Sequence, residues 1–362
     1  MKGAQRILAF HLLNDKSGSP KVLRQLLTDW TKFNDVEIHL FSSFNENGFL
    51  TDIKGVHFHR TWYRFASNPW LRLVFYSWSQ LMLMIKLLFI LRKSDIVYIN
   101  TVLPFGAAIA AKLKSCRVIY HIHEVSIRPK VLKWFLLYVV RNTANEIIYV
   151  SKYVKNTHNI TNVESHVVYN AIEESFLESV TAKEQKSELT NVLMVCSLKK
   201  YKGVLEFLAL ANSHSKYHFK LVLNAQESEI KNFFHGIALP NNLTILPVQK
   251  NLHPFYHWAD VILNLSRPDE WIETFGLTII EGMAYALPAI VPPVGGILEV
   301  IENGVTGFAI DSRDTNLLNK KLEYILEDLD VYKMMSQNAK SRLEIFREKN
   351  MLSQVEKIIF GA

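Results

Sequence analysis

Cysteine is scarce in this chain, since Cys116 and Cys196 are the only two among 362 residues. Two cysteines so far apart support neither a disulfide framework nor a cysteine-based zinc site, and they fit a reducing compartment. A signal peptide is not expected either, because the first apolar run, residues 6–13, ends at Asn14 and Asp15 without a small-residue cleavage site. These absences favour a cytoplasmic protein.

Long hydrophobic runs are also rare. Residues 73–91 approach the length of a membrane span, but they include Lys86, whose burial in lipid costs about 2.5–3.5 kcal/mol. The polar residues Arg72, Ser79, Lys86 and Lys93 recur every seven positions along one stripe of the expected helix. We therefore favour a helix of a soluble domain over a membrane-spanning helix.

The overall composition is that of a globular protein. It is 49% hydrophobic and 21% charged, which excludes a disordered or low-complexity chain, and its length predicts two domains. The formal net charge of +7 favours phosphate-bearing ligands or an anionic membrane surface. Nucleic acid is not expected as a partner, because no basic cluster accompanies a recognisable reading element.

Short β-branched runs alternate with helical patterns along the whole chain, and continuous apolar strands between helices predict α/β domains with doubly wound parallel sheets. The predicted strands are residues 6–12, 36–41, 56–60, 96–100, 117–121, 146–150 and 166–168, then 192–196, 219–224, 244–247, 261–265, 289–291 and 307–310. We expect two Rossmann-like domains that face a central cleft. Their predicted bounds are 1–170 and 191–345, with a polar linker at 171–190 and a final helix at 346–362 that packs back on the amino-terminal domain.

The densest motif lies at residues 263–288, where a strand end at Ser266, a loop and a helix follow one another. Glu273 lies at the mouth of that helix, where free backbone N–H groups favour anions. Glu281 lies about 6 Å along the helix among apolar residues, where a carboxylate needs strong donors such as the two hydroxyls of a ribose. Two carboxylates at different depths suit different parts of one elongated ligand.

This motif resembles the retaining GT-B glycosyltransferases of glycosyltransferase family 4. The family pattern appears in order as Glu273-Thr-Phe-Gly-Leu277, Glu281, a strand led by Pro288, and Gly295-Gly-Ile-Leu-Glu299. The resemblance is strong between residues 192 and 310 and patchier in the amino-terminal half. It implies the GT-B fold and a hexosyltransferase of the bacterial polysaccharide, O-antigen or capsule type.

The resemblance also implies roles for individual residues. Glu281 would hold the donor ribose, Glu273 would contact the donor sugar near the reacting carbon, and Ser266 would belong to the same donor site. The backbone amides that would line the sugar and phosphate are those of Phe275, Gly276 and Leu277.

One position departs from the family pattern. An Arg and a Lys usually follow the first strand of the second domain; Lys202 matches the Lys, but Ser197 stands at the Arg position. Cations there stabilise the leaving diphosphate. We expect Lys202 to act in catalysis and Lys199, or else Lys200 or Arg267, to replace the missing guanidinium.

Two features of the amino-terminal half extend the resemblance. Gly18 lies in the loop of residues 16–20, before a helix expected from Lys21, and resembles the family's glycine loop near the donor phosphates. The segment Tyr120-His-Ile-His-Glu124 ends a strand and places His123 where the family has a histidine near the sugar and acceptor. We predict a functional role for His123 and a structural one for His121.

No Asp-x-Asp motif follows a predicted strand; the one that occurs, Asp328-Leu-Asp330, falls in the helical tail. We therefore expect neither a metal nor a cofactor, with lysines and helix amides holding the diphosphate. The resemblance then implies transfer of a sugar from a nucleotide-diphosphate sugar to a hydroxyl with retention of configuration, the departing phosphate taking the acceptor proton.

Basic and aromatic residues alternate in two segments of the amino-terminal half, residues 60–72 and 128–141. Such segments suit peripheral docking on an anionic leaflet, although core helices with solvated flanks would give the same pattern. Together with the resemblance they favour a lipid-linked glycan acceptor in capsule or lipopolysaccharide biosynthesis, at the inner face of the cytoplasmic membrane.

Other functions stay open at this point. Ser197 at the Arg position would suit a non-catalytic subunit that only binds a nucleotide sugar. A nucleotide-sugar epimerase or a sugar phosphorylase could use the same scaffold, but an epimerase needs paired acids and a phosphorylase usually needs a pyridoxal phosphate lysine and a longer chain.

Overall fold

The computed structural model of the protein describes residues 5–44, 48–183 and 186–361. The chain divides into two compact units, and each is described by itself. The amino-terminal unit comprises residues 1–169 together with 351–362, and the carboxyl-terminal unit comprises residues 170–350. Each unit is built around one parallel sheet, which confirms the predicted α/β class and its doubly wound sheets.

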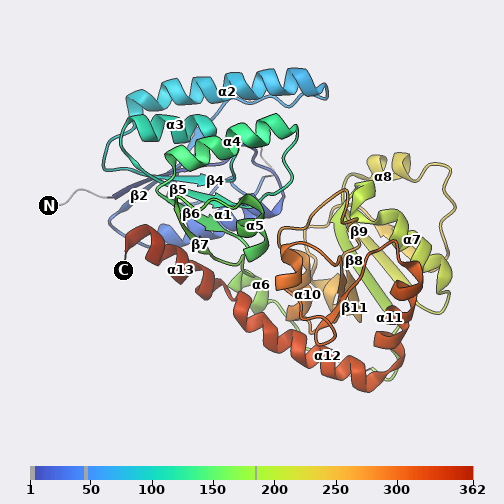
Figure 1. Cartoon of the computed structure of the whole chain (residues 1–362). Coiled ribbons are helices and arrows are strands. Elements are labelled where there is room, and N and C mark those ends of the chain that lie inside the picture. Colours follow the sequence, from blue (N-terminus) through green and yellow to red (C-terminus); the bar gives the residue numbers. More distant parts are fainter. Residues whose placement is uncertain (1–4, 45–47, 184–185, 362) are drawn as a thin grey trace. The chain divides into compact units, whose positions relative to one another are not determined.

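The sheet of the amino-terminal unit has seven strands in the order β3-β2-β1-β4-β5-β6-β7, and all neighbours are parallel. Its strands are β1 (Gln5–Phe10), β2 (Val36–Ser42), β3 (Val56–Arg60), β4 (Ile96–Asn100), β5 (Arg117–Ile122), β6 (Glu146–Tyr149) and β7 (Glu164–Val167). Its helices are α1 (Gly18–Trp30), α2 (Pro69–Ile90), α3 (Phe105–Leu113), α4 (Lys130–Thr143), α5 (Lys152–His158) and most of α13 (Glu348–Phe360). Figure 1 shows α2, α3 and α4 together on one face of this sheet.

Helix α1 begins earlier than the sequence indicates. Ser17 has an extended backbone and Gly18 is the first helical residue, so the expected loop of residues 16–20 runs into the helix before Lys21. Helix ends are the least certain feature of a sequence pattern, because the first turn is not yet amphipathic. Gly18 therefore lies in the first turn of α1, directly after the segment that follows β1.

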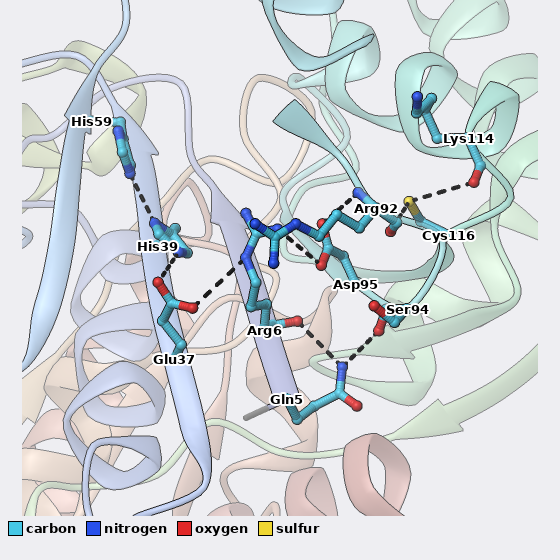
Figure 2. Close-up of polar contacts among 10 residues, drawn as sticks. All are labelled: Gln5, Arg6, Glu37, His39, His59, Arg92, Ser94, Asp95, Lys114 and Cys116. Atoms are coloured by element: carbon cyan, nitrogen blue, oxygen red, sulfur yellow. Dashed lines mark hydrogen bonds and ion pairs between the residues drawn. The ribbon is translucent and has the colours of Figure 1, made fainter. Parts of the chain in front are cut away.

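A polar network fastens the first four strands of this sheet (Figure 2). Arg6 on β1 forms ion pairs with Glu37 on β2 at 3.8 Å and with Asp95, next to β4, at 3.4 Å. The ring of His39 bonds Glu37 at 3.0 Å and His59 of β3 at 2.9 Å. Polar side chains thus link four adjacent strands in addition to the backbone ladder.

The end of the chain completes the amino-terminal unit. Phe360 of α13 packs its ring 5.3 Å from that of Phe33, just after α1. Arg117 on β5 donates to the carbonyls of Ile358 and Ile359 at the last turn of α13. Residues about 240 positions apart in sequence are therefore neighbours in this unit.

The sheet of the carboxyl-terminal unit has six parallel strands in the order β10-β9-β8-β11-β12-β13. Its strands are β8 (Asn191–Ser197), β9 (His218–Asn224), β10 (Leu243–Leu246), β11 (Val261–Leu263), β12 (Ala289–Val291) and β13 (Gly307–Ala309). Its helices are α6 (Glu174–Glu178), α7 (Val204–Ser213), α8 (Glu227–Phe233), α9 (His253–Trp258), α10 (Leu277–Ala284), α11 (Thr315–Glu327) and α12 (Leu329–Arg342), with 3-10 turns η1 (Lys200–Lys202), η2 (Gly296–Glu299) and η3 (Leu343–Phe346).

In both units the strand order reverses at the first strand. β1 lies between β2 and β4, and β8 lies between β9 and β11. In open α/β sheets such a switch point leaves a crevice at the carboxyl ends of the two central strands, and ligands bind there. We therefore expect the functional side chains to lie at the two switch points.

Candidate active site

The switch point of the carboxyl-terminal unit is closed by a tight approach of two loops. Gly203, after η1, has φ +78°, and a Cβ at this position would lie 2.1 Å from the carbonyl oxygen of Leu265, which follows β11. The backbone N–H of Arg267 donates to the Tyr201 carbonyl at 2.8 Å. Because only glycine tolerates both the dihedral angle and the contact, residue 203 sets the spacing between the two loops.

Three donors converge on one carboxylate oxygen at this switch point. The Oε1 atom of Glu273 accepts hydrogen bonds from Lys202 Nζ at 2.6 Å, Ser266 Oγ at 2.6 Å and Asn264 Nδ2 at 3.3 Å. The side chains of Lys202 and Glu273 are 15% and 14% exposed, so the ion pair is largely removed from water. The structure thus brings together three residues that the sequence singled out, Glu273, Lys202 and Ser266, and adds Asn264.

The charge state of Glu273 follows from these contacts. Burial alone would raise its pKa, but Lys202, Ser266 and Asn264 outweigh burial and lower the pKa below the ordinary value. Lys202 also lies 4.8 Å from the ring centroid of Trp271, which adds a cation–π contact. Glu273 is therefore an anion at neutral pH, with fixed donors behind it.

Glu281 occupies a second position, on α10. It is 6% exposed, and its Oε2 accepts a hydrogen bond from the hydroxyl of Tyr256 on α9 at 2.6 Å. Burial and the neighbouring carboxylate raise the pKa of Tyr256, so the phenol keeps its proton and can only donate to Glu281. The sequence does not predict a role for Tyr256, because nothing in the residues around it marks a partner 25 positions further along.

The loop before α10 is shaped by glycines. Gly276 has φ +144° and precedes Leu277, the first residue of the helix, while Phe275 is buried against Phe346 at 5.7 Å between ring centroids. The backbone of Glu273 pairs with Gly295, where a Cβ would lie 2.3 Å from the Glu273 carbonyl oxygen. The backbone of this loop therefore packs against the backbone of Gly295 near the start of α10.

The candidate cations differ in their ion pairs and in their exposure to solvent. Arg267 donates to Glu206 at 2.6 Å and to Glu270 at 2.8 Å, so its guanidinium is already paired with two carboxylates. Lys199 and Lys200 are exposed, and no ion pair of Lys199 occurs within residues 5–44, 48–183 and 186–361. Lys199 lies two residues after Ser197, the last residue of β8.

In the amino-terminal unit the switch-point strands carry a buried polar chain. His123 Nε2 lies 2.9 Å from Asn100 Oδ1, and Asn100 Nδ2 donates to His11 Nδ1 at 3.0 Å and to the Ser19 carbonyl at 3.1 Å. Because the Ser19 carbonyl can only accept, the Asn100 amide nitrogen is fixed on that side and its oxygen faces His123. His123 therefore carries its proton on Nε2 and presents Nδ1 as an acceptor.

Burial keeps this chain of imidazoles neutral. Burial, with smaller contributions from His121 and His11, holds the pKa of His123 well below its ordinary value, and burial lowers the pKa of His11 to about 4. The adjacent Glu124 accepts from the backbone N–H groups of Val102 and His123, and burial raises its pKa to about 7. The sequence does not predict Asn100 and Glu124 as functional residues, because the motif indicates only His123.

His121 is fully buried beside Tyr98 and His123. Its Nδ1 bonds the hydroxyl of Tyr98 on β4 at 2.7 Å, and its ring centroid lies 4.3 Å from that of His123. The Asp-x-Asp sequence of the tail caps a helix, since Asp328 accepts from the backbone N–H groups of Asp330 and Val331. Within the described residues, no group of three or more His, Cys, Asp or Glu could hold a metal ion.

Comparison with known proteins gives this architecture a family. Residues 17–176 match the model of glycosyltransferase family 4, and residues 178–342 match that of the group 1 glycosyl transferases. The chain is 28% identical over 220 residues to the N-acetyl-alpha-D-glucosaminyl L-malate synthase of Bacillus anthracis, covering 57% of each chain. It is 25% identical over 279 residues to an uncharacterized glycosyltransferase of Methanocaldococcus jannaschii, covering 73% of this chain and 74% of the relative.

Solved structures show the same fold. The crystal structure of the Anabaena protein HepE in complex with UDP-glucose superposes with a TM-score of 0.78 at 17% identity, over 99% of this chain and 100% of HepE. Both matched models fall on the two Rossmann-like units, which establishes the GT-B fold. The chain therefore belongs to the GT-B glycosyltransferases, with an amino-terminal domain of family 4 and a carboxyl-terminal domain of group 1.

Proposed function

We propose that this enzyme transfers a glycosyl group from a nucleotide-diphosphate sugar to a hydroxyl of a glycan acceptor, with retention of the anomeric configuration. The observation that carries the proposal is the convergence of Lys202, Ser266 and Asn264 on Glu273 at the switch point. An ionised, prepositioned carboxylate can accept hydrogen bonds from sugar hydroxyls and favour positive charge that develops at the anomeric carbon.

The nucleotide would lie further along the same site. Glu281 would accept from the two hydroxyls of the ribose, and Tyr256 would hold the carboxylate in place for them. The backbone amides of Phe275, Gly276 and Leu277 would face the sugar and diphosphate at the start of α10. A uridine nucleotide is the donor to test first, because HepE was crystallised with UDP-glucose.

The leaving diphosphate needs cations. Lys202 is already at the site, and we assign the place of the missing guanidinium to Lys199 rather than Arg267, because Arg267 is paired with Glu206 and Glu270. As the bond from the anomeric carbon to the phosphate oxygen breaks, the acceptor oxygen bonds to the same carbon. The acceptor proton moves to the departing phosphate, so the step needs no protein nucleophile and no metal.

The amino-terminal unit would serve the acceptor. Neutral His123, with Nδ1 as an acceptor, would orient a hydroxyl of the sugar or of the acceptor. Gly18, in the first turn of α1, would take the role of the family's glycine loop. We further propose a lipid-linked glycan as the acceptor. The enzyme would then act at the inner face of the cytoplasmic membrane, in the biosynthesis of a bacterial surface polysaccharide.

A panel of nucleotide sugars tests the donor site. We expect one donor to raise the unfolding temperature of the wild-type protein and to be hydrolysed slowly, and Glu281→Ala to lose most of that stabilisation. Lys202→Ala should weaken donor binding as well, whereas Glu227→Gln, an exposed glutamate on α8, serves as the matched control. Wild-type donor affinity in both Glu281→Ala and Lys202→Ala would show that the site assignment is wrong.

The products separate the proposed reaction from its rivals. Retention predicts that proton NMR of the first product shows the same anomeric configuration as the donor, with full activity in a chelating buffer. Donor binding without turnover of any acceptor would instead support a non-catalytic subunit. Conversion of the donor to its epimer without an acceptor would support an epimerase.

A further inference from the structure

The outer side of α2 is an unusually apolar surface. Eight large apolar side chains on this helix are between 38% and 87% exposed: Trp70, Leu71, Val74, Trp78, Leu81, Met82, Ile85 and Phe89. Successive members of this set lie one, three or four residues apart, which places them along one face of the helix. Among the helices of the described residues, α2 alone is long and apolar enough to cross a membrane, yet only 28% of its most apolar window is buried.

The opposite side of α2 is fastened to the amino-terminal unit. Tyr76 donates to the Leu103 carbonyl at 2.5 Å, and the side chain of Gln80 accepts from the backbone N–H of Gly106 at 3.2 Å. A Cβ on Gly106 would lie 2.1 Å from the Gln80 carbonyl oxygen, so α2 and α3 are in close backbone contact. A helix bound to its domain in this way lies along the surface and is not free to cross a bilayer.

Neighbouring segments extend the apolar surface. Trp62 and Phe65 are exposed and rest on the start of α2, where Trp62 packs on Phe75 at 5.9 Å and the Arg72 guanidinium lies 4.4 Å from the Phe65 ring centroid. On α4, which Figure 1 shows on the same face of the sheet, three more large side chains are exposed: Val131, Trp134 and Tyr138. We call these residues, with the eight on α2, the α2–α4 surface.

The charge around the α2–α4 surface has one sign. Residues 53–145 contain 14 lysines and arginines, against Asp95 and Glu124 as the only acidic residues. Both acidic groups are used inside the unit, since Asp95 is 1% exposed and Glu124 accepts two backbone N–H bonds. The exposed basic residues around the surface are Arg60, Arg64, Lys86, Arg92, Lys93, Lys112, Arg128 and Lys130.

We propose that the α2–α4 surface docks the enzyme on a bilayer that contains anionic phospholipid, with α2 lying in the plane of the interface. Tryptophan and tyrosine favour the headgroup region, long aliphatic side chains enter the acyl boundary, and the basic residues meet the negative surface potential. Only the purpose of this docking rests on the proposed function. That purpose is to bring the donor site to a lipid-linked acceptor.

A second copy of the chain fits this surface less well than lipid. A twofold interface would place the same patch against itself, and so would bring the basic residues of both copies together. Like charges across an interface oppose association. An anionic bilayer instead neutralises them.

Flotation with lipid vesicles tests the proposal on the full-length protein. We expect wild type to float with vesicles of equal parts phosphatidylglycerol and phosphatidylcholine, to float poorly with phosphatidylcholine alone, and to dissociate as salt is raised. A Trp70→Ala/Trp78→Ala/Phe89→Ala variant should bind about tenfold more weakly or worse. A Lys86→Gln/Arg92→Gln/Lys93→Gln variant should lose the preference for phosphatidylglycerol.

A matched control keeps the result specific to this surface. Met334, Ile345 and Tyr324 are 48%, 47% and 44% exposed on the carboxyl-terminal unit, and their combined replacement by alanine should leave vesicle binding unchanged. UDP should raise the unfolding temperature of the Trp70→Ala/Trp78→Ala/Phe89→Ala variant as much as that of wild type. This measurement separates membrane docking from donor binding. The proposal is overturned if wild type ignores anionic vesicles, binds both compositions equally, or forms dimers that this variant abolishes.

Discussion

The ion pair between Lys202 and Glu273 can be tested with a double-mutant cycle. Removing one partner of a buried pair leaves an uncompensated charge and costs about 3–5 kcal/mol. The side chains here are 15% and 14% exposed, so we expect the lower end, about 3 kcal/mol, for Lys202→Met or Glu273→Gln alone. In the double variant no charge is left unpaired, and Ser266 can still donate to the amide oxygen, so the loss should fall to about 1 kcal/mol.

Calorimetry of the full-length protein measures this cycle. Each kcal/mol shifts the midpoint of a unit of this size by about 2–4 °C, so either single variant should unfold about 6–12 °C lower and the double variant should recover most of the loss. Donor binding should stay lost in the double variant, which would separate the structural role of the pair from its functional role. Additive effects of the two substitutions, or single losses under about 2 °C, would refute the reasoning.

The same pair predicts a pH dependence. The contacts of Glu273 lower its pKa below the ordinary value of 4.5, so its contribution to stability is present above that pH and is lost as the pH falls through the folded-state pKa. In Lys202→Met, burial is opposed by Ser266 and Asn264 alone and raises the pKa of Glu273 relative to wild type. The stability deficit of this variant should therefore shrink as the pH is lowered toward 4.5.

Three further substitutions test other parts of the structure. Gly203→Ala should cost at least about 1 kcal/mol more than Gly236→Ala in calorimetry, because the two glycines have φ +78° and +76° but only Gly203 faces a backbone oxygen at 2.1 Å. Equal losses would exclude the close approach. Asn100→Asp puts a carboxylate against His123 Nε2 and should raise the pKa of that imidazole. An ionisation absent from wild type should then enter the pH–rate profile of donor hydrolysis. An unchanged profile would argue against a role for His123. Tyr256→Phe should raise the donor KM about tenfold and leave kcat nearly unchanged, and an unchanged KM would contradict its positioning role.

The sequence predicts the two parallel sheets because their strands are continuous apolar runs separated by helical patterns. It places Glu273 and Ser266 in one site through the motif of residues 263–288, and Lys202 through the segment that follows the first strand of the second domain. The structure puts Lys202 and Ser266 within hydrogen-bond distance of Glu273. Tyr256 and Asn100 are different, since each acts on a residue that the fold brings from another element. Such pairings depend on sheet order, and no local pattern encodes them.

Helix α2 shows a second limit of sequence patterns. The sequence marks a stripe through Ser79 and Lys86 as its polar side, but Ser79 is 4% exposed and lies on the covered side while Phe89 is 87% exposed. Periodicity identifies faces on a helix, and it does not say which face the domain covers when nearly the whole circumference is apolar. The packing on α3, through Gln80 and Gly106, decides the orientation.

The position of α13 has a consequence for biosynthesis. The amino-terminal sheet is synthesised well before residues 358–360, in which Arg117 and Phe33 find their partners. The nascent amino-terminal unit must therefore wait, with part of its surface uncovered, until residues 358–360 have left the ribosome. A chain cut after residue 350 should show faster amide exchange around Arg117 than the intact protein, and its newly made form should depend more on chaperones.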